Sequence, residues 1–225
     1  MNHCLYCYEP LEKSLTWSQW LTVEKPSVLC SSCAGTLEVI SGKRCEGCSR
    51  SWKGKLCLDC QQWRELGDNI EKNYSVFHYN DALRDMIRQW KFRGDYVLRE
   101  VFRNELQRAF KKQFADKYPR IAVVPIPISE NRMQERGFNQ SLALADMLEC
   151  PVNQALGKRS GENQASSNRK VRLKRDNPFF ITKPLKQTAL IVDDVYTTGT
   201  TVRQAAQQLK LHGCPAVYVL TIARS

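Results

Sequence analysis

One stretch of the chain, residues 189–201, combines acids, hydroxyls and glycine in an order suited to binding a phosphorylated ligand. An apolar run ends in Asp193 and Asp194, and a loop rich in threonine and glycine then opens a predicted helix. Amides at the start of a helix attract anions, and carboxylates beyond a strand end could accept ribose hydroxyls or bind Mg²⁺. We therefore expect an anion-binding loop formed by Thr197, Thr198, Gly199, Thr200 and Thr201.

The competing interpretation of this stretch is an ordinary strand, turn and helix with a threonine cap. That interpretation does not explain why two acids would lie unpaired beside an anion-binding loop. Gly199 favours the ligand site, because a residue without Cβ allows a phosphate to approach the backbone closely.

A second predicted strand, residues 121–124, ends in Pro125 and Ile126 and is followed by Arg132 and Arg136. Guanidinium groups bind phosphate in a bidentate manner, so two arginines on the outgoing loop could hold a pyrophosphate group. The alternative is a pair of solvent-facing arginines before a helix. The acidic loop after the other strand favours the first interpretation, because ligands of α/β sheets bind at the carboxyl ends of strands.

Eight of the ten cysteines form four Cys-x-x-Cys pairs within the first 60 residues. In a reducing compartment such pairs indicate metal rather than disulfides, and two pairs complete a tetrahedral zinc site. Sequential pairing would give one site from Cys4, Cys7, Cys30 and Cys33 and another from Cys45, Cys48, Cys57 and Cys60. A crossed arrangement or a single filled site is the alternative. Closed sites of this kind serve folding, so we expect one or two structural Zn²⁺ ions; contact with nucleic acid or protein is the second interpretation.

The rest of the chain alternates predicted strands and helices. Strands are expected at 74–79, 121–124, 188–192 and 216–222, and helices at 80–90, from Gly94 to about 117, at 139–148 and at 200–212. Residues 157–178 are polar and basic, and we expect a mobile loop there. The pattern predicts an α/β fold with a parallel sheet and helices on both faces. It divides the chain into a small cysteine-bearing domain at 1–66 and a larger domain at 67–225.

The net charge of +11 belongs almost entirely to the larger domain, whose 26 basic and 16 acidic residues leave a net +10. Such an excess indicates polyanionic ligands, either phosphorylated metabolites or nucleic acid, with a solubilising surface as the alternative. A membrane span needs roughly 20 apolar residues and no run approaches that length. The first residues lack the pattern of a secretory leader, so we expect a soluble cytoplasmic protein.

Together these motifs resemble the ComF family of bacterial competence proteins, most closely its ComFC type. The resemblance covers nearly the whole chain and rests on the cysteine pairs, residues 90–95 and 125–140, and the loop at 193–201. It implies a double zinc ribbon followed by a type I phosphoribosyltransferase fold that binds phosphoribosyl pyrophosphate with Mg²⁺. Asp193 and Asp194 would contact the ribose, and residues 197–201 the 5′-phosphate. Gln164 and Arg172 match a glutamine and an arginine of the family's mobile loop.

The resemblance also implies a role in DNA uptake during natural transformation, together with a helicase-like competence protein. The leading hypothesis is a competence factor that binds phosphoribosyl pyrophosphate and single-stranded DNA. The alternatives are a phosphoribosyltransferase of nucleobase salvage and a non-catalytic sensor that recruits partners. Displacement of pyrophosphate through a cation-like transition state needs no dedicated nucleophile, so no residue is assigned a catalytic role.

Overall fold

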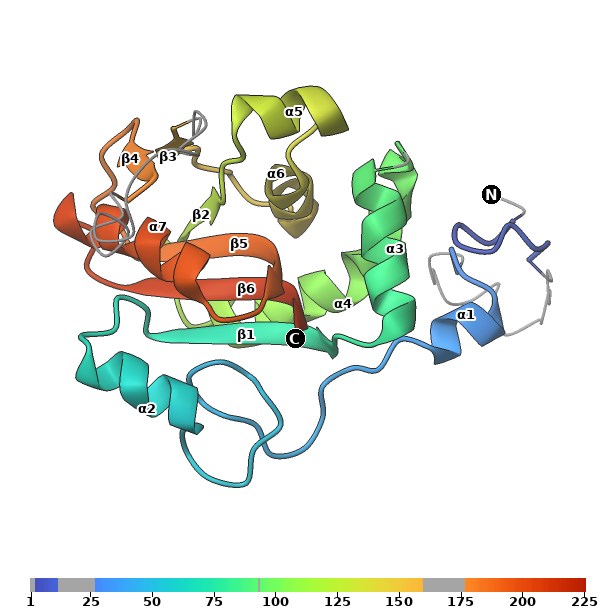
Figure 1. Cartoon of the computed structure of the whole chain (residues 1–225), viewed down its shortest axis with the longest axis horizontal. Coiled ribbons are helices and arrows are strands. Elements are labelled where there is room, and N and C mark those ends of the chain that lie inside the picture. The colour runs from blue at the N-terminus through green and yellow to red at the C-terminus, as the bar shows by residue number, and fades with distance from the viewer. Residues whose placement is uncertain (1–2, 12–26, 93, 160–176) are drawn as a thin grey trace, which may run out of the picture.

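The centre of the molecule is a parallel sheet of four strands in the order β1-β6-β5-β2. The structure is a computed structural model that describes residues 3–11, 27–92, 94–159 and 177–225 (Figure 1). The strands are β1 (Lys72–His78), β2 (Ala122–Pro125), β5 (Ala189–Tyr196) and β6 (Val217–Arg224). Most of their residues are buried on both faces, as in parallel sheets covered by helices. The expected parallel α/β fold is confirmed.

Helices cover both faces of this sheet (Figure 1). The helices α3 (Asp81–Phe92), α4 (Glu100–Phe110) and α6 (Gln140–Ala145) pack on one face, and α7 (Thr200–Leu211) packs on the other. Short turns extend them: η2 (Tyr96–Arg99) leads into α4, η3 (Lys111–Ala115) continues α4, and η4 (Asp146–Leu148) continues α6. None of the helices in the described ranges is long and apolar enough to cross a membrane.

Local sequence signals set where two of these helices begin. The Asn80 side chain accepts a hydrogen bond from the Leu83 amide at 3.0 Å, which caps α3. Asn139 caps α6 in the same way, accepting from the amides of Ser141 and Leu142 at 2.9 and 3.3 Å. These caps therefore define the residues at which α3 and α6 begin.

One helix and one pair of strands in the larger domain were not expected from the sequence. A short helix, α5 (Glu130–Arg136), occupies part of the segment that was expected to be a loop; none of its residues is buried, so no apolar period marks it. An antiparallel pair, β3 (Leu156–Lys158) and β4 (Phe179–Ile181), brackets the segment that was expected to be a mobile loop. Most of that segment, residues 160–176, lies outside the described residues.

Strand β5 is longer than expected and includes both acids. The sequence pattern predicted its end at residue 192, but β6 continues as its partner, with Asp193 opposite Thr221 and Tyr196 opposite Arg224. Its other neighbour, β2, stops at Pro125, which pairs with Val192, and the Ile126 amide donates to the Val192 carbonyl at 3.1 Å. The carboxylates therefore lie beyond the end of β2, where β5 has no neighbouring strand on that side and the covering helices can reach it.

The cysteine-bearing segment covers the outer edge of β1. The Ile40 amide donates to the Val76 carbonyl at 2.9 Å, and the His78 amide donates to the Glu38 carbonyl at 2.9 Å. Asn73 of β1, only 2% exposed, donates from its side chain to the Cys48 carbonyl at 3.2 Å. Two short helices, α1 (Ser31–Gly35) and α2 (Leu58–Glu65), belong to this segment. A sheet edge that would otherwise present unpaired backbone groups is thereby closed.

The Asn73 side chain provides a test of this attachment. Asn73→Ala removes the donor to the Cys48 carbonyl and to Ser75 Oγ, the latter at 2.8 Å; Ser75 Oγ keeps its hydrogen bond with Thr221 Oγ1, but the Cys48 carbonyl loses its side-chain donor. We expect the free energy of unfolding to fall by about 1–3 kcal/mol, measured by urea denaturation. Asn104→Ala on the exposed surface of α4 is the control and should change it by less than about 0.5 kcal/mol. Equal effects of the two substitutions would contradict a structural role for Asn73.

Candidate functional site

Two carboxylates lie buried at the carboxyl end of β5. Asp193 is 8% exposed and Asp194 is 6% exposed. Ser141 of α6 donates its hydroxyl to Asp193 Oδ1 at 2.9 Å, and the Asp194 amide donates to the same oxygen at 3.0 Å. Lys91 of α3 forms an ion pair with Asp194 Oδ2. The expectation that these acids are unpaired was wrong, because two covering helices each bring a polar side chain to the strand end.

Sequence reasoning missed two residues of this site, Ser141 and Lys91. The predicted helix ended at about Trp90, and Lys91 was given no part in the ligand site. The structure instead turns it toward the sheet, where its side chain is 17% exposed. The signal that could have identified it is its position in residues 90–95, one of the segments on which the family resemblance rests.

Burial has a direct effect on the ionisation of Asp193. Loss of hydration, together with the neighbouring charge of Asp194, raises the pKa of Asp193 to about 7, although the hydrogen bond from Ser141 and the charge of Lys91 oppose the rise. Asp193 therefore titrates close to neutral pH. A cation bound beside it would favour the charged form.

The threonine-rich loop connects β5 to α7. Gly199 lies in the left-handed region at φ +79° and immediately precedes α7. A Cβ at this position would lie 2.1 Å from Arg203 Nη1 and 2.2 Å from Tyr196 Oη. The protein's own packing therefore requires glycine here, independently of any ligand. The loop hydroxyls are exposed and belong to Thr197, Thr198, Thr200 and Thr201.

A buried arginine supports this loop from the protein side. Arg203, in the first turn of α7, is 4% exposed and makes two hydrogen bonds of 3.0 Å to the carboxylate of Asp68. It also donates to Tyr196 Oη, and its guanidinium carbon lies 4.4 Å from the ring centre of Trp63 in α2. This network links the start of α7 to the segment after α2, and no sequence motif indicated it.

The residues after β2 lie at the same end of the sheet. The Ile126 carbonyl, just after Pro125, accepts a hydrogen bond from Asn139 at 3.0 Å. Arg132 is exposed on α5, whereas Arg136 is half-buried with its guanidinium 4.9 Å from the ring centre of Phe92. Burial and the charge of Arg132 lower the pKa of Arg136, and the charges of Asp194 and Asp193 oppose this. Arg136 is therefore close enough to the acids to interact with them.

Two nitrogens of Arg136 stand out among the polar groups of the described residues. Nε and Nη1 are buried and have no hydrogen-bond partner. A buried guanidinium usually binds an anion, because its five donors are costly to leave unpaired. An oxyanion at the strand ends would supply the missing acceptors. Gln164 and Arg172, the other predicted ligand contacts, lie outside the described residues.

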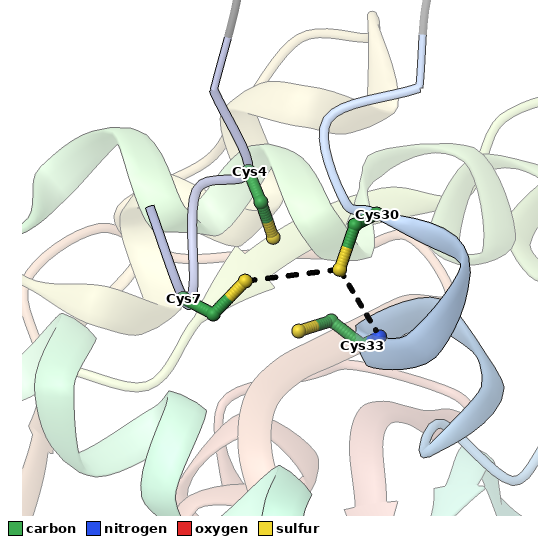
Figure 2. A group of neighbouring side chains, drawn as sticks. All are labelled: Cys4, Cys7, Cys30 and Cys33. Carbon is green, nitrogen blue, oxygen red and sulfur yellow. Dashed lines mark hydrogen bonds between the residues drawn. The ribbon is translucent and has the colours of Figure 1, made fainter. Parts of the chain in front are cut away.

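The cysteines gather into two groups that match sequential pairing. One consists of Cys4, Cys7, Cys30 and Cys33 and the other of Cys45, Cys48, Cys57 and Cys60, with the sulfurs of each group within 4.8 Å of one another. The side chains of the first group point toward a common centre (Figure 2). The crossed arrangement is excluded by these groupings.

The geometry of both groups fits a tetrahedral zinc ion. Cys7 and Cys30 have sulfurs 3.7 Å apart, as do Cys48 and Cys57. Zinc–sulfur bonds of about 2.3 Å in a tetrahedron place the sulfurs about 3.8 Å apart. The Cys57 amide also donates to the Cys45 sulfur at 3.2 Å, a contact that stabilises thiolate. All four ligand positions are filled by protein in each group, which is typical of structural sites.

Comparison with known proteins adds near full-length similarity. No protein-family model matches the chain. It is 34% identical over 224 residues to competence protein ComFC of Streptococcus pneumoniae, covering 98% of this chain and 99% of that protein. It is 32% identical over 229 residues to competence protein ComFC of Bacillus subtilis, covering 99% and 95%. It is 32% identical over 227 residues to DNA utilization protein YhgH of Escherichia coli, covering 88% and 97%.

The cysteine groups predict the metal content of the protein. Purified wild type should contain about two zinc ions per chain, because each group offers four thiolates. Cys7→Ser and Cys57→Ser should each lower the content to about one, measured by inductively coupled plasma mass spectrometry after anaerobic purification. Cys214→Ser is the control and should leave it unchanged, since Cys214 belongs to neither group. Less than one zinc per chain in wild type would contradict the assignment.

The raised pKa of Asp193 predicts that the site destabilises the ligand-free protein. Between about pH 4 and pH 7 the folded form keeps a proton on Asp193 that the unfolded form loses, so stability falls as pH rises through this window. Asp193→Asn keeps the shape and removes the charge. Without Mg²⁺ it should raise the free energy of unfolding by about 1–4 kcal/mol at pH 8 and change it little at pH 4.

Urea denaturation at both pH values measures this effect. The matched control is Asp116→Asn, at an exposed position, which should shift stability by less than about 0.5 kcal/mol at either pH. A drop in stability of Asp193→Asn at pH 8 would show that Lys91 and Ser141 fully compensate the buried charge.

Proposed function

This chain belongs to the family of ComFC competence proteins, and from that membership and the geometry at its strand ends we propose a function in DNA uptake. In this proposal it binds phosphoribosyl pyrophosphate with Mg²⁺ and handles single-stranded DNA during natural transformation. The observation that carries the ligand assignment is the convergence of three chemistries at the carboxyl ends of β2 and β5. These are a buried pair of acids, a loop of exposed hydroxyls at a helix start, and an arginine with unpartnered buried donors.

Each part of phosphoribosyl pyrophosphate has a matching group. The 5′-phosphate would occupy the loop at 197–201, where hydroxyls and the start of α7 offer donors. The ribose hydroxyls would donate to Asp193 and Asp194. The pyrophosphate would accept from Arg136, assisted by Arg132, and would lie against Pro125 and Ile126. Gln164 and Arg172 are proposed to contact the ligand as well.

The acids also fit a divalent cation. Carboxylate oxygens are preferred Mg²⁺ ligands, and Mg²⁺ commonly bridges one or two carboxylates and a substrate phosphate. The ammonium of Lys91 against Asp194 supports this assignment, since the acids already attract a positive charge. Bound Mg²⁺ would neutralise the pyrophosphate next to these acids.

The DNA part of the proposal has two sources of support. Residues 67–225 hold 26 basic and 16 acidic residues, an excess that attracts polyanions. Relatives of this chain carry the names competence protein and DNA utilization protein. We propose that a helicase-like protein of the uptake machinery is the partner that shares the DNA.

Isothermal titration calorimetry with phosphoribosyl pyrophosphate, with and without Mg²⁺, tests the ligand site. The double variant Asp193→Asn/Asp194→Asn should bind at least about tenfold more weakly and lose its dependence on Mg²⁺, on the scale of about 1.5–3 kcal/mol for each charged hydrogen bond. Arg136→Ala should weaken the binding of phosphoribosyl pyrophosphate more than the binding of ribose 5-phosphate, because ribose 5-phosphate lacks the pyrophosphate group.

The matched control is Asp116→Asn/Asp146→Asn, which makes the same charge change at exposed positions and should bind as wild type does. No binding by wild type at millimolar ligand would overturn the proposal. Release of pyrophosphate with a nucleobase would instead favour a phosphoribosyltransferase of base salvage. Binding without turnover, with DNA present or absent, would favour a sensor that recruits partners.

A further inference from the structure

The residues just before Cys45 and the loop between the last two cysteine pairs form an open hollow that shares no residue with the candidate ligand site. Its volume is about 610 Å³, and it is lined by Lys43, Ser51, Trp52, Lys53 and Gly54. Pockets of roughly 300–1,000 Å³ are typical of ligand sites. The hollow thus combines one large aromatic surface with two positive charges.

The loop that forms this hollow is held in place by the backbone. The Trp52 amide donates to the Lys43 carbonyl at 3.2 Å, and the Glu46 amide donates to the Lys55 carbonyl at 2.9 Å. Between these two hydrogen bonds, Arg44 and Ser51 form an antiparallel β-bridge. Both strands of the loop leave directly from cysteine pairs, so a bound zinc ion would brace its base.

Trp52 is positioned with its indole partly available. It is half-buried and packs against the core that contains Cys45, Cys48, Cys57 and Cys60. Gly54 allows the chain to pass beside the indole, since a Cβ there would lie 3.1 Å from Trp52 Nε1. A ring that is anchored on one side and open on the other is suited to stacking.

The charges around Trp52 are available for an external partner. Lys43, Lys53 and Lys55 are exposed, and none of their ammonium groups has an ion-pair or hydrogen-bond partner among the described residues. The other basic residues of the loop are occupied: Arg50 pairs with Asp59 at 2.9 Å, and Arg44 donates to the carbonyls of Ile40 and Ser75.

The basic face of α3 is a weaker candidate for an external polyanion. Arg84 pairs with Asp81 at 2.9 Å, and Lys91 pairs with Asp194 within the candidate ligand site. The positive charges of α4 are similarly engaged, with Arg103 paired to Glu100 and Arg108 to Glu105. Arg88 of α3 is exposed and has no partner among the described residues, so α3 offers one free charge, whereas three unpaired lysines lie around Trp52.

We propose that the hollow around Trp52 is a binding site for single-stranded DNA, in which one base stacks on the indole and the flanking phosphates contact Lys43, Lys53 and Lys55. An aromatic platform with flexible cations around it binds single strands with little sequence preference, because every base has a stacking face. Duplex DNA keeps its bases stacked internally, so it can use the lysines but not the indole. This assignment rests on the proposed function and gives its DNA contact a location.

Fluorescence anisotropy with a fluorescein-labelled 15-nucleotide oligo(dT) tests the site. Trp52→Ala should weaken binding at least about tenfold with an unchanged salt dependence, whereas Trp52→Phe, which keeps an aromatic face, should stay within about threefold of wild type. Lys43→Ala/Lys53→Ala/Lys55→Ala should lower the slope of log affinity against log salt by about 2, because each neutralised phosphate of a single strand contributes about 0.7 to that slope. A duplex of the same length should be insensitive to Trp52→Ala.

The matched control is Lys111→Ala/Lys112→Ala/Lys117→Ala, which removes the same charge from the exposed end of the α4 region. It should change affinity for oligo(dT) by less than about threefold. Zinc content and binding of phosphoribosyl pyrophosphate should match wild type in all variants and report intact folding.

If Trp52→Ala and Lys43→Ala/Lys53→Ala/Lys55→Ala both bind oligo(dT) as well as wild type does, the proposed site is overturned, but the DNA part of the proposed function is not. An equal weakening in the two lysine triples also overturns it, since binding would then depend on overall charge. Absence of oligo(dT) binding by wild type overturns both this site and the DNA part of the proposed function, whatever the calorimetry with phosphoribosyl pyrophosphate gives.

Discussion

An ionised carboxylate buried at the end of a strand requires neutralising partners, and much of this molecule is arranged around that need at Asp193 and Asp194. Two helices on one face of the sheet supply them, with Ser141 coming from α6 and Lys91 from α3. Because β2 ends at Pro125, these side chains can reach the acids from the side where the ladder stops. The incomplete neutralisation leaves the pKa of Asp193 raised, which suits a site that must exchange charge with a cation or a hydroxyl-bearing ligand.

The loop after β5 depends on a second buried charge. Arg203 is held by both oxygens of Asp68 and lies against Trp63 and Tyr196. Removing one partner of such a pair leaves a buried charge uncompensated. The contacts of Arg203 therefore hold the start of α7, and with it the loop, in one geometry. The same contacts join α7 to the segment that follows the last cysteine pair. The phosphate loop and the cysteine-bearing segment are thus parts of one packed arrangement, although they lie far apart in the sequence.

The two cysteine groups take different places in this arrangement. Cys4 and Cys33 pack with the core beneath α3 and α4, whereas Cys45, Cys48, Cys57 and Cys60 pack with the core that includes α7. Between them the chain runs along the outer edge of β1 and supplies its hydrogen bonds. A segment of this size has little core of its own, so metal ligation and attachment to the sheet stabilise it together.

The alternation of the four sheet strands with helices and the grouping of the cysteines were readable from the sequence, because each is a local pattern of residue types. Periodicity predicted the buried face of α3, and cysteine spacing predicted the two ligand groups. The length of β5 could not be read locally, because its last residues are strand only through pairing with β6. The partners of the buried charges are likewise products of tertiary structure. Lys91 reaches Asp194 across 103 positions of sequence and Asp68 reaches Arg203 across 135, and only the packing of helices on the sheet brings such groups together.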